Sequence, residues 1–149
     1  MTTGSLLYLD DLRVGQEFLT ATHTIDSGQI VRFASEFDPQ PFHLDADAAV
    51  SGPFGALAAS GWHTAAVTMR LIVEGVPLAG GIVGAGGEIA WTKPVRPGDT
   101  LRVIATTADI RLSRSRPDRG IVTIRCETRN QHDQVVQVFV AKLIVPKRS

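Results

Sequence analysis

Residues 62–74 constrain the fold more than any other segment, because they form a helix-length run with apolar side chains on nearly every side. These apolar residues are Trp62, Ala65, Ala66, Met69, Leu71, Ile72 and Val73. A helix that is apolar almost all round is normally a buried one. Gly75 and Pro77 follow the run and are typical of a helix end. The rest of the chain must therefore supply a cover for most of a central helix.

The second half of the chain changes to a strand-like period. Ile121, Thr123, Arg125 and Glu127 alternate with apolar residues, as expected for a half-buried strand. We expect strands at residues 18–25, 82–92, 100–114, 121–130 and 135–145. Short connections, including turns at 116–120 and 130–133, indicate that the sheet is antiparallel.

These elements predict an α+β protein in which a curved antiparallel sheet wraps round one long helix. Its 149 residues fit a single domain, 1–149, with a sizeable core. A curved sheet of this kind has edge strands that must be hidden. Pairing with a second copy hides an edge, so we expect a homodimer. Gly84, Gly86 and Gly87 suggest a bulge or a close approach of backbone or ligand within one strand.

Composition argues against several classes of partner. The formal net charge is zero, so bulk charge does not drive binding to nucleic acid or to an anionic membrane. Cys126 is the only cysteine, which excludes an internal disulfide and a cysteine-based zinc site. The four histidines lack metal-ligand spacing, so we expect no metal. Residues 1–12 do not resemble a signal peptide and no apolar stretch is long enough to span a bilayer, which favours a cytoplasmic location.

Residues 38–43, D-P-Q-P-F-H, place a carboxylate and an imidazole five positions apart with two prolines between them. Each proline restricts its own φ and pushes the preceding residue away from helical geometry. We therefore expect a stiff, extended turn that is not helical. Such a turn can hold Asp38 and His43 over one water molecule and move its protons. The alternative is a loop in which Asp38 caps a helix and His43 lies on the surface.

The segments on either side have helical signals. Asp26 is expected to cap a helix, with Gln29 completing a capping box. That helix must stop near Asp38 because Pro39 follows. Asp45 is expected to cap another short turn over residues 46–50.

Three motifs together resemble the MaoC-like dehydratases, the hot-dog-fold group that includes (R)-specific enoyl-CoA hydratases. The first is residues 37–43, which keep the family's aspartate, second proline and histidine but have Phe37 for glycine and Gln40 for asparagine. The second is A-S-G-W-H, residues 59–63, with Ser60 where many members have histidine. The third is W-T-K-P-V-R-P-G-D, residues 91–99. The resemblance runs from about residue 9 to residue 145.

The resemblance implies reversible addition of water to a trans-2-enoyl-CoA thioester, with coenzyme A as part of the substrate and no other cofactor. Asp38 would be the general base and His43 would orient the water, although sequence leaves their division of labour open. Gly61 would donate its N–H to the developing oxyanion at the start of the central helix. Ser60 would either cap that helix or touch the Asp–His pair.

Several further side chains are weaker candidates for substrate binding. Cations in or beside turns can meet coenzyme A phosphates, in one chain or across a dimer interface, or can simply be solvated. They are Lys93, Arg96, Arg114, Arg116 and Arg119. The aromatic residues near the motifs can shape an acyl pocket or belong to the core, namely Phe33, Phe37, Phe42, Phe54 and Trp62. His63 can line the pocket, but a hydrogen-bonded core or interface position is the stronger expectation.

Two other functions remain open on the sequence. Thioesterases of the hot-dog fold usually place their acid on the central helix, where Glu74 is the only acidic residue and lies at the far end. A non-catalytic acyl-binding dimer would explain the departures at Phe37 and Gln40.

Overall fold

A computed structural model describes residues 5–149 and contains one five-stranded sheet. Its strand order is β1-β3-β4-β5-β2, and every neighbouring pair is antiparallel. The strands are β1 (Glu17–Thr24), β2 (Gly84–Trp91), β3 (Thr100–Leu112), β4 (Arg119–Arg129) and β5 (Val135–Pro146). The expected five strands are confirmed, with bounds shifted by a few residues at most ends. Arg119 and Gly120 belong to β4 and not to the preceding turn.

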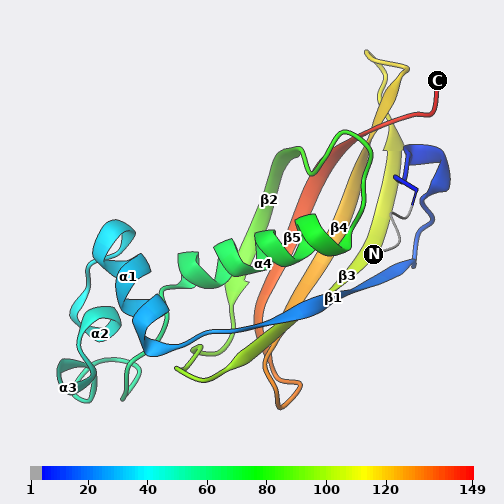
Figure 1. Ribbon diagram of the computed structural model, residues 1–149. Helices are drawn as coiled ribbons and strands as arrows, with labels where there is room; N and C mark the ends of the chain where they lie inside the picture. The colour runs from blue at the N-terminus through cyan, green and yellow to red at the C-terminus, as the bar shows by residue number, and fades with distance from the viewer. Residues whose placement is uncertain (1–4) are drawn as a thin grey trace.

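The helix α4 (Gly61–Gly75) lies across one face of this curved sheet (Figure 1). Its Leu71 and Ile72 are buried in the same core as Val103 and Ile124 of the sheet. In β4 the expected alternation is confirmed, since the side chains at 122, 124 and 126 are buried. Burial also raises the pKa of the Cys126 thiol to about 12. The arrangement is the expected α+β hot-dog fold.

Three helices gather at one end of the molecule, beside the start of α4 (Figure 1). They are α1 (Ser27–Phe37), α2 (Pro41–Leu44) and α3 (Ala46–Ala49), and the 3-10 helix η1 (Leu9–Asp11) lies apart from them. The Asp26 carboxylate accepts a hydrogen bond from the Gln29 N–H at 2.8 Å, so the expected cap is present. The Gln29 side chain donates to the Thr24 carbonyl and the Asp26 carboxylate instead of closing a capping box.

The segment after Pro39 corrects one expectation. Gln40 is extended, but Pro41 begins the single turn of helix α2, which includes His43. Proline is well suited to the first position of a helix because the N–H that it lacks has no partner there. The two prolines therefore act differently: the first ends the region of α1, and the second starts α2.

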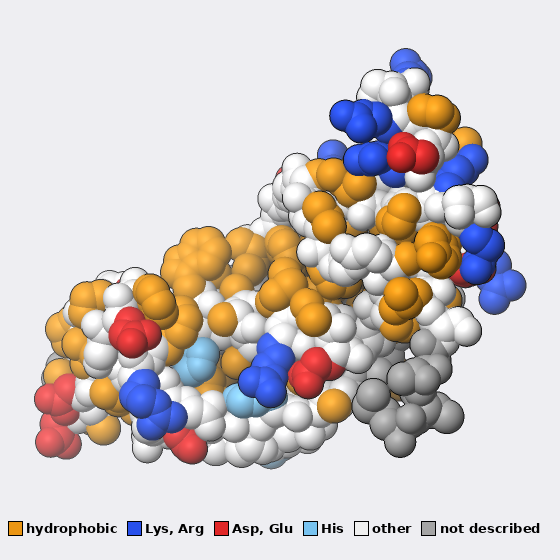
Figure 2. All heavy atoms as spheres, turned by 45° about the horizontal axis from the view of Figure 1, so that its top comes forward, with side chains coloured by type: hydrophobic (Ala, Val, Ile, Leu, Met, Phe, Trp, Pro, Cys, Tyr) orange, Lys and Arg blue, Asp and Glu red, His pale blue; other side chains and the backbone are white. Residues whose placement is uncertain are grey.

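A second correction concerns the cover of α4. Trp62, Met69 and Val73 are 59%, 40% and 55% exposed, so one stripe of the helix is open to solvent in the single chain. The sheet covers only the opposite side, and Figure 2 shows hydrophobic side chains gathered on the open face. The Trp62 ring meets Trp91 of β2 with centroids 5.0 Å apart. The apolar stripe therefore continues onto β2, which is an edge strand.

The glycines of β2 form the expected bulge. The register with β5 shifts between Gly84 and Gly86, and Gly86 has a positive φ of 144°. A Cβ on Gly87 would lie 2.7 Å from the Val140 carbonyl oxygen, so close strand approach requires glycine there. In the part of the chain that the structure describes, no helix is both long and apolar enough to cross a membrane.

A buried polar chain links α4 to the sheet. The Trp91 indole N–H donates to Gln137 Oε1 at 3.0 Å, and Gln137 Nε2 donates to Thr68 Oγ1 at 2.9 Å. The Thr68 hydroxyl shares a further hydrogen bond of 2.6 Å with Thr128. Gln137 and Thr128 have no exposed surface. These side chains satisfy one another, as buried polar groups generally must.

Candidate active site

Asp38 and His43 meet at the end of the molecule where α1, α2 and α4 converge. Asp38 follows the last residue of α1, and His43 lies in α2. The two side chains approach with Oδ2 of Asp38 3.4 Å from Nε2 of His43. His43 is buried and Asp38 is half-buried. One water molecule can reach both atoms, so the prediction that the side chains converge is confirmed and the surface-loop alternative is wrong.

The orientation of His43 is fixed by a backbone carbonyl. Its Nδ1 lies 2.6 Å from the Ala58 oxygen, which can only accept, so Nδ1 carries the proton. In the neutral ring Nε2 is then an acceptor that faces the carboxylate. The rings of Phe42 and Phe54 pack against the imidazole with centroids 4.6 and 6.2 Å away. When the His43 ring is neutral, its Nε2 and the Asp38 carboxylate present two acceptors to the same small volume.

The Asp38 carboxylate is held in its ionised form. Burial raises the pKa of Asp38, but hydrogen bonds from Gln40 and Ser60 and the nearby His43 together outweigh it, so the pKa lies below its ordinary value. The Ser60 hydroxyl donates to Oδ2 at 2.7 Å, and the Gln40 amide donates to Oδ1. Asp38 is therefore ready to accept a proton at neutral pH.

Ser60 performs both functions that the sequence left as alternatives. It is the N-cap of α4, where its Oγ accepts from the Trp62 N–H at 3.2 Å. The same hydroxyl donates a hydrogen bond to Asp38 Oδ2. Ser60 thereby connects the start of α4 to the end of α1 through hydrogen bonds.

Gly61 is the first residue of α4, and within residues 5–149 its N–H donates no hydrogen bond. It lines a cleft of about 220 Å³ together with His43 and Trp91. A Cβ on Gly61 would lie 2.5 Å from the Trp91 ring, so the indole packs directly on this glycine. A free backbone N–H at a helix start, beside a hollow, suits a developing negative charge.

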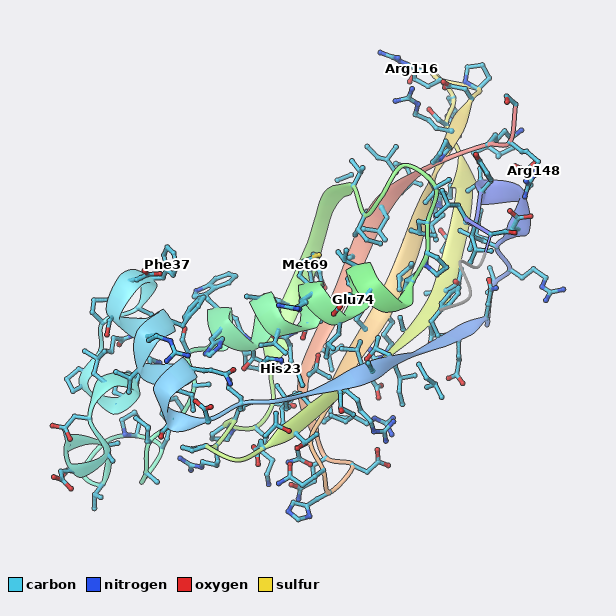
Figure 3. All side chains as sticks on the ribbon, viewed as in Figure 1. His23, Phe37, Met69, Glu74, Arg116 and Arg148 are labelled. Carbon is cyan, nitrogen blue, oxygen red and sulfur yellow. The ribbon has the colours of Figure 1, made fainter. Side chains whose placement is uncertain are left out.

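The predicted cations are distributed unevenly. Lys93 lines the same cleft as Gly61. The Arg96 guanidinium donates to the carbonyls of residues 54, 56 and 57, so its main contacts are with the loop before α4. Arg114 and Arg116 belong to the β3–β4 connection; Figure 3 shows Arg116 at the opposite end from Phe37, the neighbour of Asp38. Within one chain they do not approach the Asp–His pair, and Arg119 pairs with Asp118.

Among the aromatic candidates, Phe54 lines the cleft. Phe37 is 69% exposed, so it is not a core residue. His63 is buried as expected, but its Nδ1 has no hydrogen-bond partner among residues 5–149, so the expected hydrogen bond is missing there. Its ring stacks on Phe33 with centroids 4.7 Å apart. His63 does not line the cleft beside Gly61.

Sequence reasoning missed three contributors to the site. Gln40 was noted only as a departure from a motif, although its amide binds Asp38. The Ala58 carbonyl orients His43, and a backbone group leaves no signal in residue type. Trp91 was quoted within a motif, but its position over Gly61 depends on the fold. Within the described residues, no group of three or more His, Cys, Asp or Glu side chains is arranged to hold a metal ion.

Comparison with known proteins identifies the family of this chain. Residues 11–130 match the model of the MaoC like domain. The chain therefore belongs to the MaoC-like domain family. This membership and its (R)-hydratase neighbours support a hydratase or dehydratase activity in general terms.

Three similar proteins cover nearly the whole chain. A MaoC-like dehydratase from Rhodospirillum rubrum is 56% identical with a TM-score of 0.94, covering 96% of this chain and 99% of that one. The R-hydratase PhaJ1 from Pseudomonas aeruginosa is 27% identical with a TM-score of 0.77, covering 95% and 86%. The uncharacterized protein YdeM of Bacillus subtilis is 36% identical over 140 residues, covering 92% and 96%.

Proposed function

We propose that the protein adds water to, or removes it from, the 2,3 double bond of an enoyl-CoA thioester. The observation that carries the proposal is the pair of acceptors, Asp38 Oδ2 and His43 Nε2, 3.4 Å apart. They lie beside a cleft lined by Gly61, whose N–H has no acceptor among residues 5–149. A water molecule that donates one hydrogen bond to each acceptor directs its lone pairs away from both of them. A β-carbon placed on that side is then attacked by the water oxygen.

The residues divide the reaction as follows. Asp38 takes a proton from water as the new C–O bond forms at the β-carbon, and the electron pair of the double bond moves toward the thioester oxygen. The Gly61 N–H donates to that oxygen as it gains negative charge. A proton then reaches the α-carbon from the Asp38–His43 pair, which returns to its starting state. Asp38 and His43 lie close enough for both to take part in proton transfer.

The proposal includes a homodimer. The exposed stripe of α4, containing Trp62, Met69 and Val73, lies beside the edge strand β2. A second copy would bury this apolar surface and cover the strand edge. Lys93 is the cation best placed to meet the substrate, because it lines the cleft. A cytoplasmic location is also part of the proposal.

An assay with crotonyl-CoA tests the function. We expect loss of the conjugated enoyl-thioester absorbance without release of free thiol, because water adds to carbon and the thioester stays intact. Thiol release would instead identify a thioesterase, and binding without either change would identify an acyl-binding protein. Glu74, the only acid on α4, pairs with Arg70 on the surface, which leaves no carboxylate on this helix beside the cleft.

The Gly61→Ala variant tests the oxyanion site. The new Cβ would lie 2.5 Å from the Trp91 ring, which its hydrogen bond to Gln137 prevents from moving freely. Overpacking of this kind costs about 1–3 kcal/mol, and a displaced oxyanion donor lowers kcat by about 100- to 1000-fold. Thermal unfolding and crotonyl-CoA turnover measure the two effects. Gly84→Ala is the matched control, since its Cβ meets nothing within 4 Å. Equal turnover in both variants would contradict the role of Gly61.

A further inference from the structure

A second hollow, of about 330 Å³, lies on a different side of α4 from the catalytic cleft and shares no lining residue with it. Residues from β1, α1 and α4 surround it. They are His23, Gln29, Arg32, Phe33, His63, Ala66, Val67 and Arg70. Two arginines and two histidines are therefore among the lining residues, and no carboxylate is. Figure 2 shows histidine side chains on this face with basic side chains on either side of them.

The two arginines are weakly engaged by the protein itself. Among residues 5–149, the Arg32 guanidinium has no ion-pair or hydrogen-bond partner. Arg70 approaches Glu74 at 3.5 Å, but both side chains are exposed, and exposed pairs contribute at most about 1 kcal/mol. Both guanidinium groups thus retain donors for a ligand. Hydrogen bonds from Gln29, and then the charge of Arg32, lower the pKa of the nearby Asp26 carboxyl, but among residues 5–149 Asp26 and Arg32 form no ion pair.

The two histidines that line the hollow differ in their hydrogen bonding. His23 Nε2 lies 2.9 Å from Gln29 Oε1, and because the Gln29 amide nitrogen donates elsewhere, His23 is the donor in this bond. Figure 3 shows His23 between β1 and α4. The His63 ring is buried, stacks on Phe33 and has an unpaired Nδ1 within the described chain. Burial, followed by the proximity of His23, lowers the pKa of His63 to about 4. Native proteins rarely leave such a group unpaired.

We propose that this hollow binds one small oxyanion of the phosphate class, held between Arg32 of α1 and Arg70 of α4. Guanidinium groups bind phosphate through paired, charge-assisted hydrogen bonds. The N–H donors of two guanidinium groups outnumber the two oxygens of a carboxylate and suit the three or four oxygens of a tetrahedral anion. The site is separate from the proposed catalytic reaction and does not depend on it. A bound anion would bridge the two helices that lead to Asp38 and Ser60.

Sulfate is the probe for a nuclear magnetic resonance titration, because it is tetrahedral and keeps its charge throughout the neutral pH range. The chain has only four histidines, so their ring C–H signals can be assigned with single variants. We expect saturable shifts of His23 and His63 signals, with the His43 and His132 signals unchanged. We also expect saturating sulfate to raise the pKa of His63 by about one unit, as a nearby opposite charge does. Inorganic phosphate at constant ionic strength should compete with sulfate, whereas acetate should not.

The variants Arg32→Ala and Arg70→Ala should each weaken sulfate binding by about 10-fold, because each loses a charge-assisted hydrogen bond. Arg111→Ala is the matched control, since Arg111 is an exposed arginine of β3 that does not line the hollow. Shifts that do not saturate, equal weakening in all three variants, or equal binding of acetate would overturn the proposal. Circular dichroism should show that all three proteins are folded, since these arginines are exposed.

Discussion

Replacement of Asp38 by asparagine should lower kcat for crotonyl-CoA hydration by about 100- to 10,000-fold, the usual contribution of a general base. Asparagine has the same shape but cannot accept a proton from water. The effect should be seen throughout the neutral range, because hydrogen bonds from Gln40 and Ser60 outweigh burial and keep the pKa of Asp38 below its ordinary value. Steady-state turnover, followed by loss of enoyl absorbance, measures it.

The fold should survive this change. Asparagine can still accept a hydrogen bond through its remaining carbonyl oxygen, and the Ser60 hydroxyl can rotate to accept from the new amide. Asp45→Asn is the matched control, because Asp45 caps α3 and asparagine is an equally good cap. The control should keep native turnover. If Asp38→Asn hydrates crotonyl-CoA at the native rate, Asp38 is not the base.

Replacement of His43 by asparagine should also remove about 100- to 10,000-fold of kcat, with little loss of stability. The asparagine amide nitrogen occupies nearly the position of Nδ1, so it can still donate to the Ala58 carbonyl at the place where His43 does. What disappears is Nε2, the atom that faces Asp38. Turnover and the thermal unfolding midpoint, measured on the same preparation, separate the catalytic from the structural contribution.

His43→Leu provides the comparison. It removes both nitrogens and leaves the Ala58 carbonyl without its partner, which should cost a further 1–3 kcal/mol, roughly, of stability. Both variants should be equally inactive, but only the leucine protein should unfold at a clearly lower temperature. Substantial turnover in His43→Asn would show that Nε2 takes no part in the chemistry.

The fold was largely predictable because its periodic signals are local. The alternation through Val122, Ile124 and Cys126 identified β4, and the apolar run after Gly61 identified α4. What failed was the extent of burial. An apolar residue such as Trp62 has the same sequence signal whether the protein's own sheet or a second copy covers it, and here its own sheet leaves 59% of it exposed.

Only the parts of the site that are built from side chains could be predicted from the sequence. Asp38 and His43 stood out because prolines fix the turn between them, and the structure brings them together. The direction of the His43 ring depends on a carbonyl 15 residues away, which no motif encodes. The one-turn helix at Pro41 was missed because proline was considered only as a helix breaker, although it also starts helices.

The buried chain of hydrogen bonds through Gln137 has a consequence for how accurately α4 is placed. Apolar contacts are non-directional and would tolerate a helix that slid along its own axis by a fraction of a turn. The Thr68 hydroxyl, bonded to both Gln137 and Thr128, is directional and allows one axial setting. Because α4 is rigid, fixing Thr68 in its middle also fixes the position of the Gly61 N–H, about two turns away, relative to Asp38 and His43. Thr68 therefore helps to set the geometry of the reaction centre, although it is buried and does not contact the substrate.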